Sequence, residues 1–184
     1  QAFRKKHMDL AHRFVADQCQ AYDELRREFE NQGFNICRVE DLTESEQNKA
    51  ASYFKNTVFP LLTPMVYDSY HGFPLMMNQL LIFGVVTRTS EEEKQQSRIT
   101  FVQIPGNLTR FFEISRKNKI IFVPIEDIIR WNMPKLFRNV EIESINLFRI
   151  TRNGDFTLEE SDDMDQDFVQ EVKQKLKTRK KGRV

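Results

Sequence analysis

Residues 60–68 read Pro-Leu-Leu-Thr-Pro-Met-Val-Tyr-Asp, and residues 71–74 read His-Gly-Phe-Pro. Neither hydrophobic periodicity nor overall composition requires this order of turn-forming and apolar residues. Pro60 and Pro64 each lack a backbone N–H and restrict the residue before them, so a helix predicted upstream cannot continue through them. We therefore predict that this stretch, called the signature segment below, is an extended, turn-rich connector.

Upstream of the signature segment, the first 32 residues predict one long amphipathic helix that stops at Gly33. Its apolar positions recur at spacings of three and four; they include Met8, Ala11, Val15, Tyr22, Leu25 and Phe29. Roughly 28 residues at 1.5 Å each would span about 42 Å, which suits a helical bundle or a coiled coil. Packing against its own domain is the alternative. In a bundle the partners would come from elsewhere, so this chain alone should expose part of the apolar stripe.

Downstream of Gly33, strands and helices do not alternate strictly. Strands are predicted at 34–39, 80–89, 98–104, 111–115, 119–123, 145–152 and 155–158, the last two joined by Asn153-Gly154. Helices are predicted at 44–58 behind a Thr43–Glu46 capping box, from Pro124 to about 137, and at 163–181. This order predicts an α+β fold, with a mixed or mostly antiparallel sheet and packed helices, preceded by the long N-terminal helix.

Composition narrows the class of protein. The chain has 28 Lys+Arg against 27 Asp+Glu and a net charge of +1, so any site for a polyanion must be a local patch. Cys19 and Cys37 lie far apart and form no Cys-x-x-Cys pair, which argues against a disulfide scaffold or a zinc site. No apolar run approaches the ~20 residues of a membrane helix. We expect a cytoplasmic protein without an integral membrane segment, and peripheral association with a membrane stays open.

Catalytic and metal-binding motifs are not evident. Neither standard glycine-rich phosphate loop occurs. The sequence has three histidines, His7, His12 and His71. His71 is best interpreted as a packing residue in a turn, because no general base or orienting carboxylate is identifiable. The acidic run 163–167 departs from a calcium loop, since Phe168 and Gln174 occupy the positions that need glycine and glutamate. We predict no catalytic and no metal-ligating residue in this chain.

A basic stripe in the last predicted helix is the one candidate binding site. Its members share a helical face and are Lys173, Lys177, Lys180 and Lys181. Such a stripe could track a phosphate chain through charge-assisted hydrogen bonds, although a solvated basic face at a helix C-terminus needs no ligand. The 16 phenylalanines leave open a nucleic-acid-binding module that stacks bases on a sheet. No basic-aromatic consensus surrounds them, so core packing is the preferred interpretation.

The signature segment is similar to the stretch that opens the middle, or head, domain of bacterial polyphosphate kinases. The residues that carry this resemblance are Pro60, Thr63, Pro64, Asp68, His71, Phe73 and Pro74, with Thr151 and Arg152 near the end of the chain. The resemblance runs from about residue 33 to residue 184. It implies that 1–32 is the last helix of a helical N-terminal domain and that 33–184 is the head domain. The chain would then be a piece of a longer protein.

Membership of that family implies an enzyme that moves the terminal phosphate of ATP onto polyphosphate with magnesium. In the family, the histidine that takes the phosphoryl group lies in C-terminal domains, so this piece alone is expected to be inactive and to bind no cofactor itself. Its implied role is to support the catalytic domains, the phosphate-chain path and dimerisation, without nucleic acid as a partner. A stand-alone nucleic-acid-binding module and a structural interaction module are the alternatives.

Overall fold

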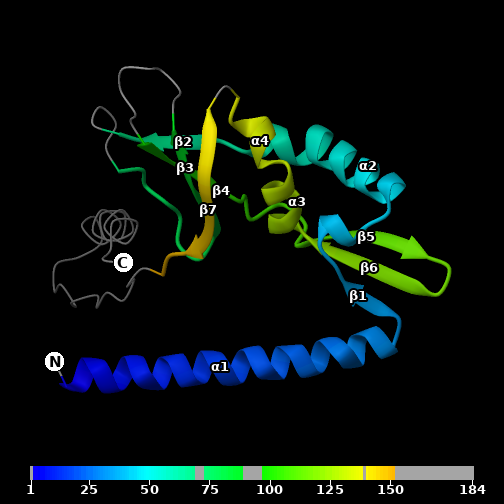
Figure 1. Cartoon of the computed structure of the whole chain (residues 1–184), viewed down its shortest axis with the longest axis horizontal. Helices are drawn as coiled ribbons and strands as arrows, with labels where there is room; N and C mark the ends of the chain where they lie inside the picture. The colour runs from blue at the N-terminus through cyan, green and yellow to red at the C-terminus, as the bar shows by residue number, and fades with distance from the viewer. Residues whose placement is uncertain (1, 69–72, 89–96, 139, 152–184) are drawn as a thin grey trace, which may run out of the picture. The chain divides into compact units, whose positions relative to one another are not determined.

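The structure is a computed structural model that describes residues 2–68, 73–88, 97–138 and 140–151 (Figure 1). The chain divides into two compact units, Gln1–Ser52 with Thr109–Ile128 and Tyr53–Leu108 with Ile129–Val184. Each unit contains helices and a sheet, so the predicted α+β class is confirmed. The strands form two separate sheets where the sequence predicted one. No helix in the described ranges is both long enough and apolar enough to cross a membrane.

The first unit begins with the predicted long helix, α1 (Ala2–Asn31). It ends where Gly33 adopts a φ of 83°, a left-handed conformation that glycine takes without steric cost. Its apolar side chains are exposed along its length: Phe3, Met8, Leu10, Phe14, Val15, Tyr22, Leu25 and Phe29. The expected exposure of an apolar stripe is therefore confirmed.

The sheet of the first unit has the order β1-β6-β5. β1 (Phe34–Ile36) runs parallel to β6 (Lys119–Pro124), which pairs in antiparallel fashion with β5 (Phe111–Arg116) as the predicted hairpin. β1 is shorter than the predicted 34–39. Residues Val39–Asp41 instead form a 3₁₀ turn, η1, in which the Val39 N–H donates to Asp127 Oδ2 at 2.8 Å.

The helix that follows η1 is α2 (Glu44–Tyr53). Glu46 accepts hydrogen bonds from both the backbone N–H and the hydroxyl of Thr43, at 3.0 and 2.8 Å, so the pair predicted as a capping box is in contact. The predicted helix 44–58 continues as a π turn, η2 (Phe54–Val58), and a 3₁₀ turn, η3 (Phe59–Leu61), in the second unit.

The sheet of the second unit is antiparallel throughout, with the order β2-β4-β3-β7. Its strands are β2 (Pro64–Tyr67), β3 (Leu81–Arg88), β4 (Ser97–Gln103) and β7 (Glu141–Arg149). The boundary between the two units falls within α3 (Ile125–Trp131), after Ile128. The next helix along the chain is α4 (Met133–Leu136). β7 begins four residues before the predicted start at 145. The hairpin predicted at 153–158 and the helix predicted at 163–181 lie outside the described residues.

One expectation for the signature segment is wrong. Part of it was predicted to be a connector, but residues 64–67 form β2 and pair with β4, with Met65 opposite Phe101. Pro64 is compatible with this pairing because it is the first residue of an edge strand. At that position a proline, which has no N–H to donate, removes few of the hydrogen bonds between strands. Met65 and Tyr67 lie on one face of the sheet and Val66 on the other, but all three are apolar or aromatic, so the sequence shows no polar–apolar alternation that would have indicated a strand.

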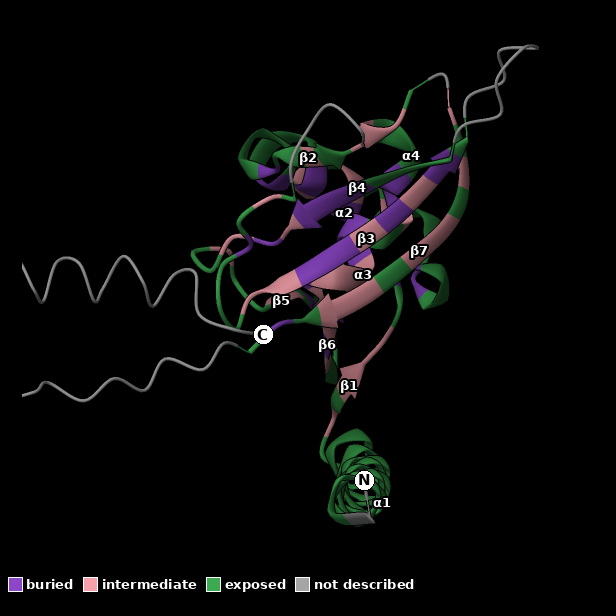
Figure 2. Cartoon of the chain, turned by 90° about the vertical axis from the view of Figure 1, so that its left-hand side faces the viewer, coloured by how far each residue is buried: buried purple, intermediate pink, exposed green. Residues whose placement is uncertain are grey.

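Buried side chains lie on both faces of the sheet of the second unit: Ile82 and Phe101 form a cluster with Met76 and Ile150 on one face, and a second group lies on the other face. Phe83, Val85 and Val102 are fully buried on that face, and Figure 2 colours much of β3 as buried. The guanidinium of Arg130, in α3, lies 5.4 Å from the centre of the Phe83 ring. This face is therefore covered by helical residues.

Candidate functional site

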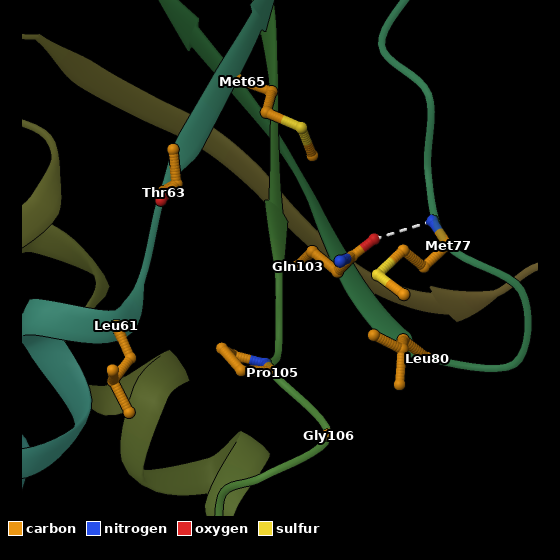
Figure 3. Close-up of a pocket in the computed structure, with 8 residues that line it drawn as sticks. All are labelled: Leu61, Thr63, Met65, Met77, Leu80, Gln103, Pro105 and Gly106. Atoms are coloured by element: carbon orange, nitrogen blue, oxygen red, sulfur yellow. Dashed lines mark hydrogen bonds between the residues drawn. The ribbon is translucent and has the colours of Figure 1, made fainter.

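The signature segment borders a cavity of about 340 Å³ in the second unit. Figure 3 shows the side chains that line it, from β2 and the turn before it on one side and from residues 77–80 and the end of β4 on the other. The main contributors are Leu61, Thr63, Met65, Met77, Leu80 and Gln103, with Pro105 and Gly106 at the loop that follows β4. One residue that carries the family resemblance, Thr63, is therefore part of the cavity lining.

Residues 73–80, called the strap below, cross one end of the sheet and form one wall of this cavity. The Met77 N–H donates to Gln103 Oε1 at 2.8 Å, a bond visible in Figure 3, and the Gln79 N–H donates to the Ile150 carbonyl at 2.9 Å. Gln79 has a φ of 63°, which turns the chain from the strap into β3. Met76 is buried against Ile82. The strap is thus fixed to β4 and to the end of β7.

Aromatic rings connect the strap to the sheet. Phe73, a signature residue, makes edge-to-face contacts with Tyr67 and with Phe101, both at centroid separations of 5.5 Å. Phe101 in turn contacts Phe148 at 6.1 Å. These phenylalanines pack against other rings of the same unit, as the preferred interpretation of the phenylalanine content expected.

Gly84 lies beneath two of these rings. A Cβ atom at this position would lie 3.3 Å from Phe148 Cε1 and 3.8 Å from Phe101 Cε1. The absence of a side chain therefore lets both rings approach the strand closely.

The predicted site residues are only partly brought together. Thr63 lines the cavity, Pro64 starts β2, and Phe73 belongs to the strap. The remaining described members are Pro60 in η3, Asp68 after β2, Pro74 in the strap and Thr151 after β7. His71, Arg152 and the four lysines of the basic stripe lie outside the described residues. No sequence signal pointed to Gln103, Met77 or Leu80, because their convergence depends on strand pairing.

The cavity is suited to apolar contact and not to phosphate. Among the described residues, the lining contains no charged side chain, and its polar side chains are the hydroxyl of Thr63 and the carboxamide of Gln103. Within the described ranges, no three His, Cys, Asp or Glu residues come together in a way that could hold a metal ion. A magnesium–triphosphate complex needs carboxylate ligands or cationic side chains. The described lining of the cavity does not fit such a complex.

An ionic contact with two hydrogen bonds joins Arg116 and Glu46 in the first unit. Arg116 donates from Nε to Glu46 Oε1 at 2.8 Å and from Nη2 to Glu46 Oε2 at 2.7 Å. The bonds from Arg116, assisted by those from Thr43, lower the pKa of Glu46 to about 2. Because both carboxylate oxygens are occupied, this pair joins α2 to the β5–β6 hairpin and is structural.

Comparison with known proteins decides the family. Residues 45–184 match the family described as "Polyphosphate kinase middle domain". The chain belongs to the polyphosphate kinase middle-domain family. The resemblance carried by the signature segment is thereby confirmed, and the cavity and strap are features of a polyphosphate kinase middle domain.

Two curated relatives show how much of a polyphosphate kinase this chain represents. The polyphosphate kinase of Staphylococcus epidermidis is 36% identical over 169 residues, which cover 92% of this chain and 22% of that protein. The polyphosphate kinase of Mycobacterium avium is 32% identical, over 87% of this chain and 23% of its own length. The chain spans less than a quarter of these relatives. Since one alignment covers 92% of the chain, it must include part of α1, which precedes the matched middle domain.

A solved structure has the same fold. The crystal structure of polyphosphate kinase from Porphyromonas gingivalis superposes with a TM-score of 0.65 and 19% identity. The match covers 76% of this chain and 24% of that one. The fold of this polyphosphate kinase middle domain is therefore shared with a known kinase structure.

Proposed function

We propose that this chain is the head domain of a polyphosphate kinase that transfers the terminal phosphate of ATP to polyphosphate. The observation that carries the proposal is the family match over residues 45–184, together with the identity to proteins named polyphosphate kinase. Those relatives are more than four times as long as the region they share with this chain. The chemistry of the whole enzyme is therefore assigned to parts of the protein beyond this domain.

Within that enzyme, the domain is non-catalytic and supports the catalytic C-terminal domains. The uncharged cavity beside the signature segment favours such a role, because its lining suits packing better than phosphate binding. ATP and magnesium are bound by the remaining domains. The domain contributes to homodimer formation and borders the phosphate-chain path. The free thiols of Cys19 and Cys37 are in keeping with a reducing cytoplasm.

We assign α1 to the preceding helical domain. Its apolar stripe is exposed, and α1 lies outside the residues that match the middle domain. Alignment with the Staphylococcus epidermidis relative nevertheless includes part of it, so the helix belongs to the kinase chain. Packing against helices that precede this region would remove the stripe from water, which stabilises by about 25 cal/mol per Å² of apolar surface.

An activity assay tests the proposal. The full-length kinase should form polyphosphate from ATP and magnesium, and residues 1–184 alone should form none. Polyphosphate synthesis by residues 1–184 would contradict the assignment of catalysis to other domains. Lack of activity in the full-length protein would contradict the assignment of the enzyme.

The basic stripe has its own test in the full-length kinase. Replacement of both Lys177 and Lys181 by Ala should weaken retention of polyphosphate and reduce the slope of log affinity against log salt by about 1–2. Lys49→Ala with Lys55→Ala removes the same charge from exposed positions of α2 and η2 and is the matched control. Equal retention by the stripe variant and the control would exclude the stripe from the phosphate path.

Competition experiments separate the alternative functions. Polyphosphate should displace labelled polyphosphate from the full-length protein far better than RNA of equal charge. Preferential RNA binding would favour a nucleic-acid-binding module. Absence of any salt-dependent anion binding would favour a structural interaction module.

A further inference from the structure

The helix α1 carries its charges in the reverse of the order that its own dipole favours. Residues 2–16 contain four basic side chains and one acidic one, whereas residues 17–31 contain five acidic side chains and two basic ones, so the two halves carry net charges of +3 and −3. The first turn has no acidic residue and the last turn has no basic residue. Because the N-terminal end of a helix is the positive end of its dipole, this order destabilises α1 on its own. The order therefore indicates a neighbour of complementary charge.

The apolar surface of α1 is wider than one neighbouring helix covers. At about 100° per residue, its apolar positions spread over an arc of about 160° between Met8 and Leu10. A two-helix coiled coil uses a narrower row of positions spaced by three and four. Such a row, called the seam below, consists of Met8, Ala11, Val15, Gln18, Tyr22, Leu25 and Phe29. A second row beside it consists of Phe3, Leu10, Phe14 and Ala21.

The seam is open to solvent over its whole length. Its five large apolar side chains are each between 47% and 58% exposed, and Figure 2 colours α1 as exposed. No other helix in the described ranges exceeds ten residues, so none of them spans α1. An exposed apolar row of this length marks a contact site on soluble proteins.

A second copy of α1 in antiparallel orientation matches both the charges and the seam. Each +3 half then lies beside a −3 half, whereas a parallel pair would place like charges side by side. We propose that two copies of this chain pair through the seams of their α1 helices, antiparallel to each other. The inference rests on the homodimer formation proposed above and names its surface. The second row stays available for the helices of the preceding domain.

One register brings the two helices together over their full length. When Ala2 lies opposite the partner's Asn31, Met8 lies opposite the partner's Leu25 and Ala11 lies opposite the partner's Tyr22. The small side chain of Ala11 leaves room for the tyrosine ring, as in cores where large and small residues face each other. The overlap of 30 residues is about 45 Å long. The seam is therefore complementary to itself in size as well as in charge.

Disulfide cross-linking between two kinds of chain tests the orientation. In a background of Cys19→Ser and Cys37→Ala, residues 1–184 with Met8→Cys are mixed with a longer, tagged form that carries Leu25→Cys. Under mild oxidation, we expect the mixed disulfide to form at least tenfold faster than either disulfide between identical chains. A parallel pair would reverse this preference and would contradict the proposal.

A matched control lies on the far side of the same helix. Arg13→Cys mixed with Gln20→Cys has the same antiparallel register, but both positions point away from the seam. We expect this mixture to cross-link at least tenfold more slowly than the seam mixture. Equal rates for the two mixtures would show that the helices form no defined pair, and would overturn the proposal.

Charge reversal tests the complementarity without weakening the helix. Lys5→Glu with Lys6→Glu makes both halves of α1 net acidic, and Glu28→Lys with Glu30→Lys makes both halves net basic. Each variant alone should lose at least tenfold in dimer affinity by analytical ultracentrifugation, and an equimolar mixture of the two should restore most of it. Both changes agree with the helix dipole, so circular dichroism should show no loss of helix. A mixture as weak as its components would contradict the antiparallel pair.

The full-length kinase separates this inference from the proposed function. The cross-link between Met8→Cys and Leu25→Cys should also form there and should require both introduced cysteines. A cross-link in residues 1–184 that is absent from the full-length kinase would show that other parts of the chain cover the seam, and would overturn the proposal. Polyphosphate formation is measured on the same samples. An active kinase without the cross-link would contradict the pairing alone, whereas a cross-linked but inactive protein would support the pairing and contradict the proposed function.

Discussion

Arg116 and Glu46 are 70 residues apart in sequence and are joined by two parallel hydrogen bonds of 2.8 and 2.7 Å. The same carboxylate also accepts from Thr43 at the start of α2. The side chain of Glu46 is 11% exposed and that of Arg116 is 39% exposed, so the pair is partly shielded from solvent. One carboxylate therefore holds the beginning of a helix and the edge strand of a sheet together.

We predict that Glu46→Gln lowers the free energy of unfolding by about 1–3 kcal/mol, the range for hydrogen bonds to charged groups. The amide cannot accept both bonds from Arg116 with the same strength, and it leaves the guanidinium without a counter-charge. Urea denaturation followed by circular dichroism measures the change. Glu44→Gln, at an exposed position in the same helical turn, is the control and should cost less. Equal losses for the two variants would contradict the special role of Glu46.

The same contact predicts an acid-dependent stability. The pKa of Glu46 falls from its ordinary value of 4.5 to about 2 in the folded chain. A depressed pKa means that the contribution is fully present above the unfolded value and is lost as pH falls from about 4.5 toward 2. The gap in urea midpoint between the original chain and Glu46→Gln should therefore narrow between pH 5 and pH 3. A gap that stays constant over this interval would show that the carboxylate is not held in its charged form.

Gly33 provides a test of backbone geometry at the end of α1. Its φ of 83° is unfavourable for other residues, and an added Cβ would lie 3.0 Å from the backbone oxygen of Asn118. We expect Gly33→Ala to lower stability by about 1–2 kcal/mol in thermal unfolding. Gly106→Ala meets only Leu80 Cδ2 at 3.4 Å and should change stability by less than about 0.5 kcal/mol. Comparable melting temperatures for the two variants would contradict this account.

Local sequence signals predicted the local parts of the fold. The spacing of apolar residues and the stop at Gly33 predicted α1, and the turn at 116–118 predicted the β5–β6 hairpin, because each depends on neighbours in the chain. The contact between Thr43 and Glu46 followed from their spacing. The bond from Arg116 to the same Glu46 did not, since only tertiary pairing brings these residues together.

In the candidate site, too, the sequence predicted local features and missed those that depend on strand pairing. Proline chemistry suggested a connector at 60–68, but pairing with β4 made residues 64–67 an edge strand. The resemblance identified Thr63 and Phe73, while Gln103, Met77 and Leu80 complete the cavity through contacts across the sheet. No turn signal in the sequence links β2 to β4, so neither this pairing nor the cavity beside it could be predicted from the sequence.

The two cysteines should differ in reactivity because their surroundings differ. Cys19 is exposed on α1, whereas Cys37 is partly buried after β1. Burial raises the pKa of the Cys37 thiol, the negative charge of Asp41 adds to this, and Arg116 opposes it. Since the thiolate is the reactive form, Cys37 should be the slower nucleophile at pH 8.

We therefore expect an aromatic disulfide reagent to react with the folded chain in two phases of equal amplitude at pH 8. Cys19→Ser should remove the fast phase, and Cys37→Ala should remove the slow one. The slow phase should accelerate as pH rises and merge with the fast phase in urea, because unfolding removes the burial that raises the pKa of Cys37. A single phase in the folded chain, or a fast phase that survives Cys19→Ser, would show that the surroundings of Cys37 do not protect its thiol.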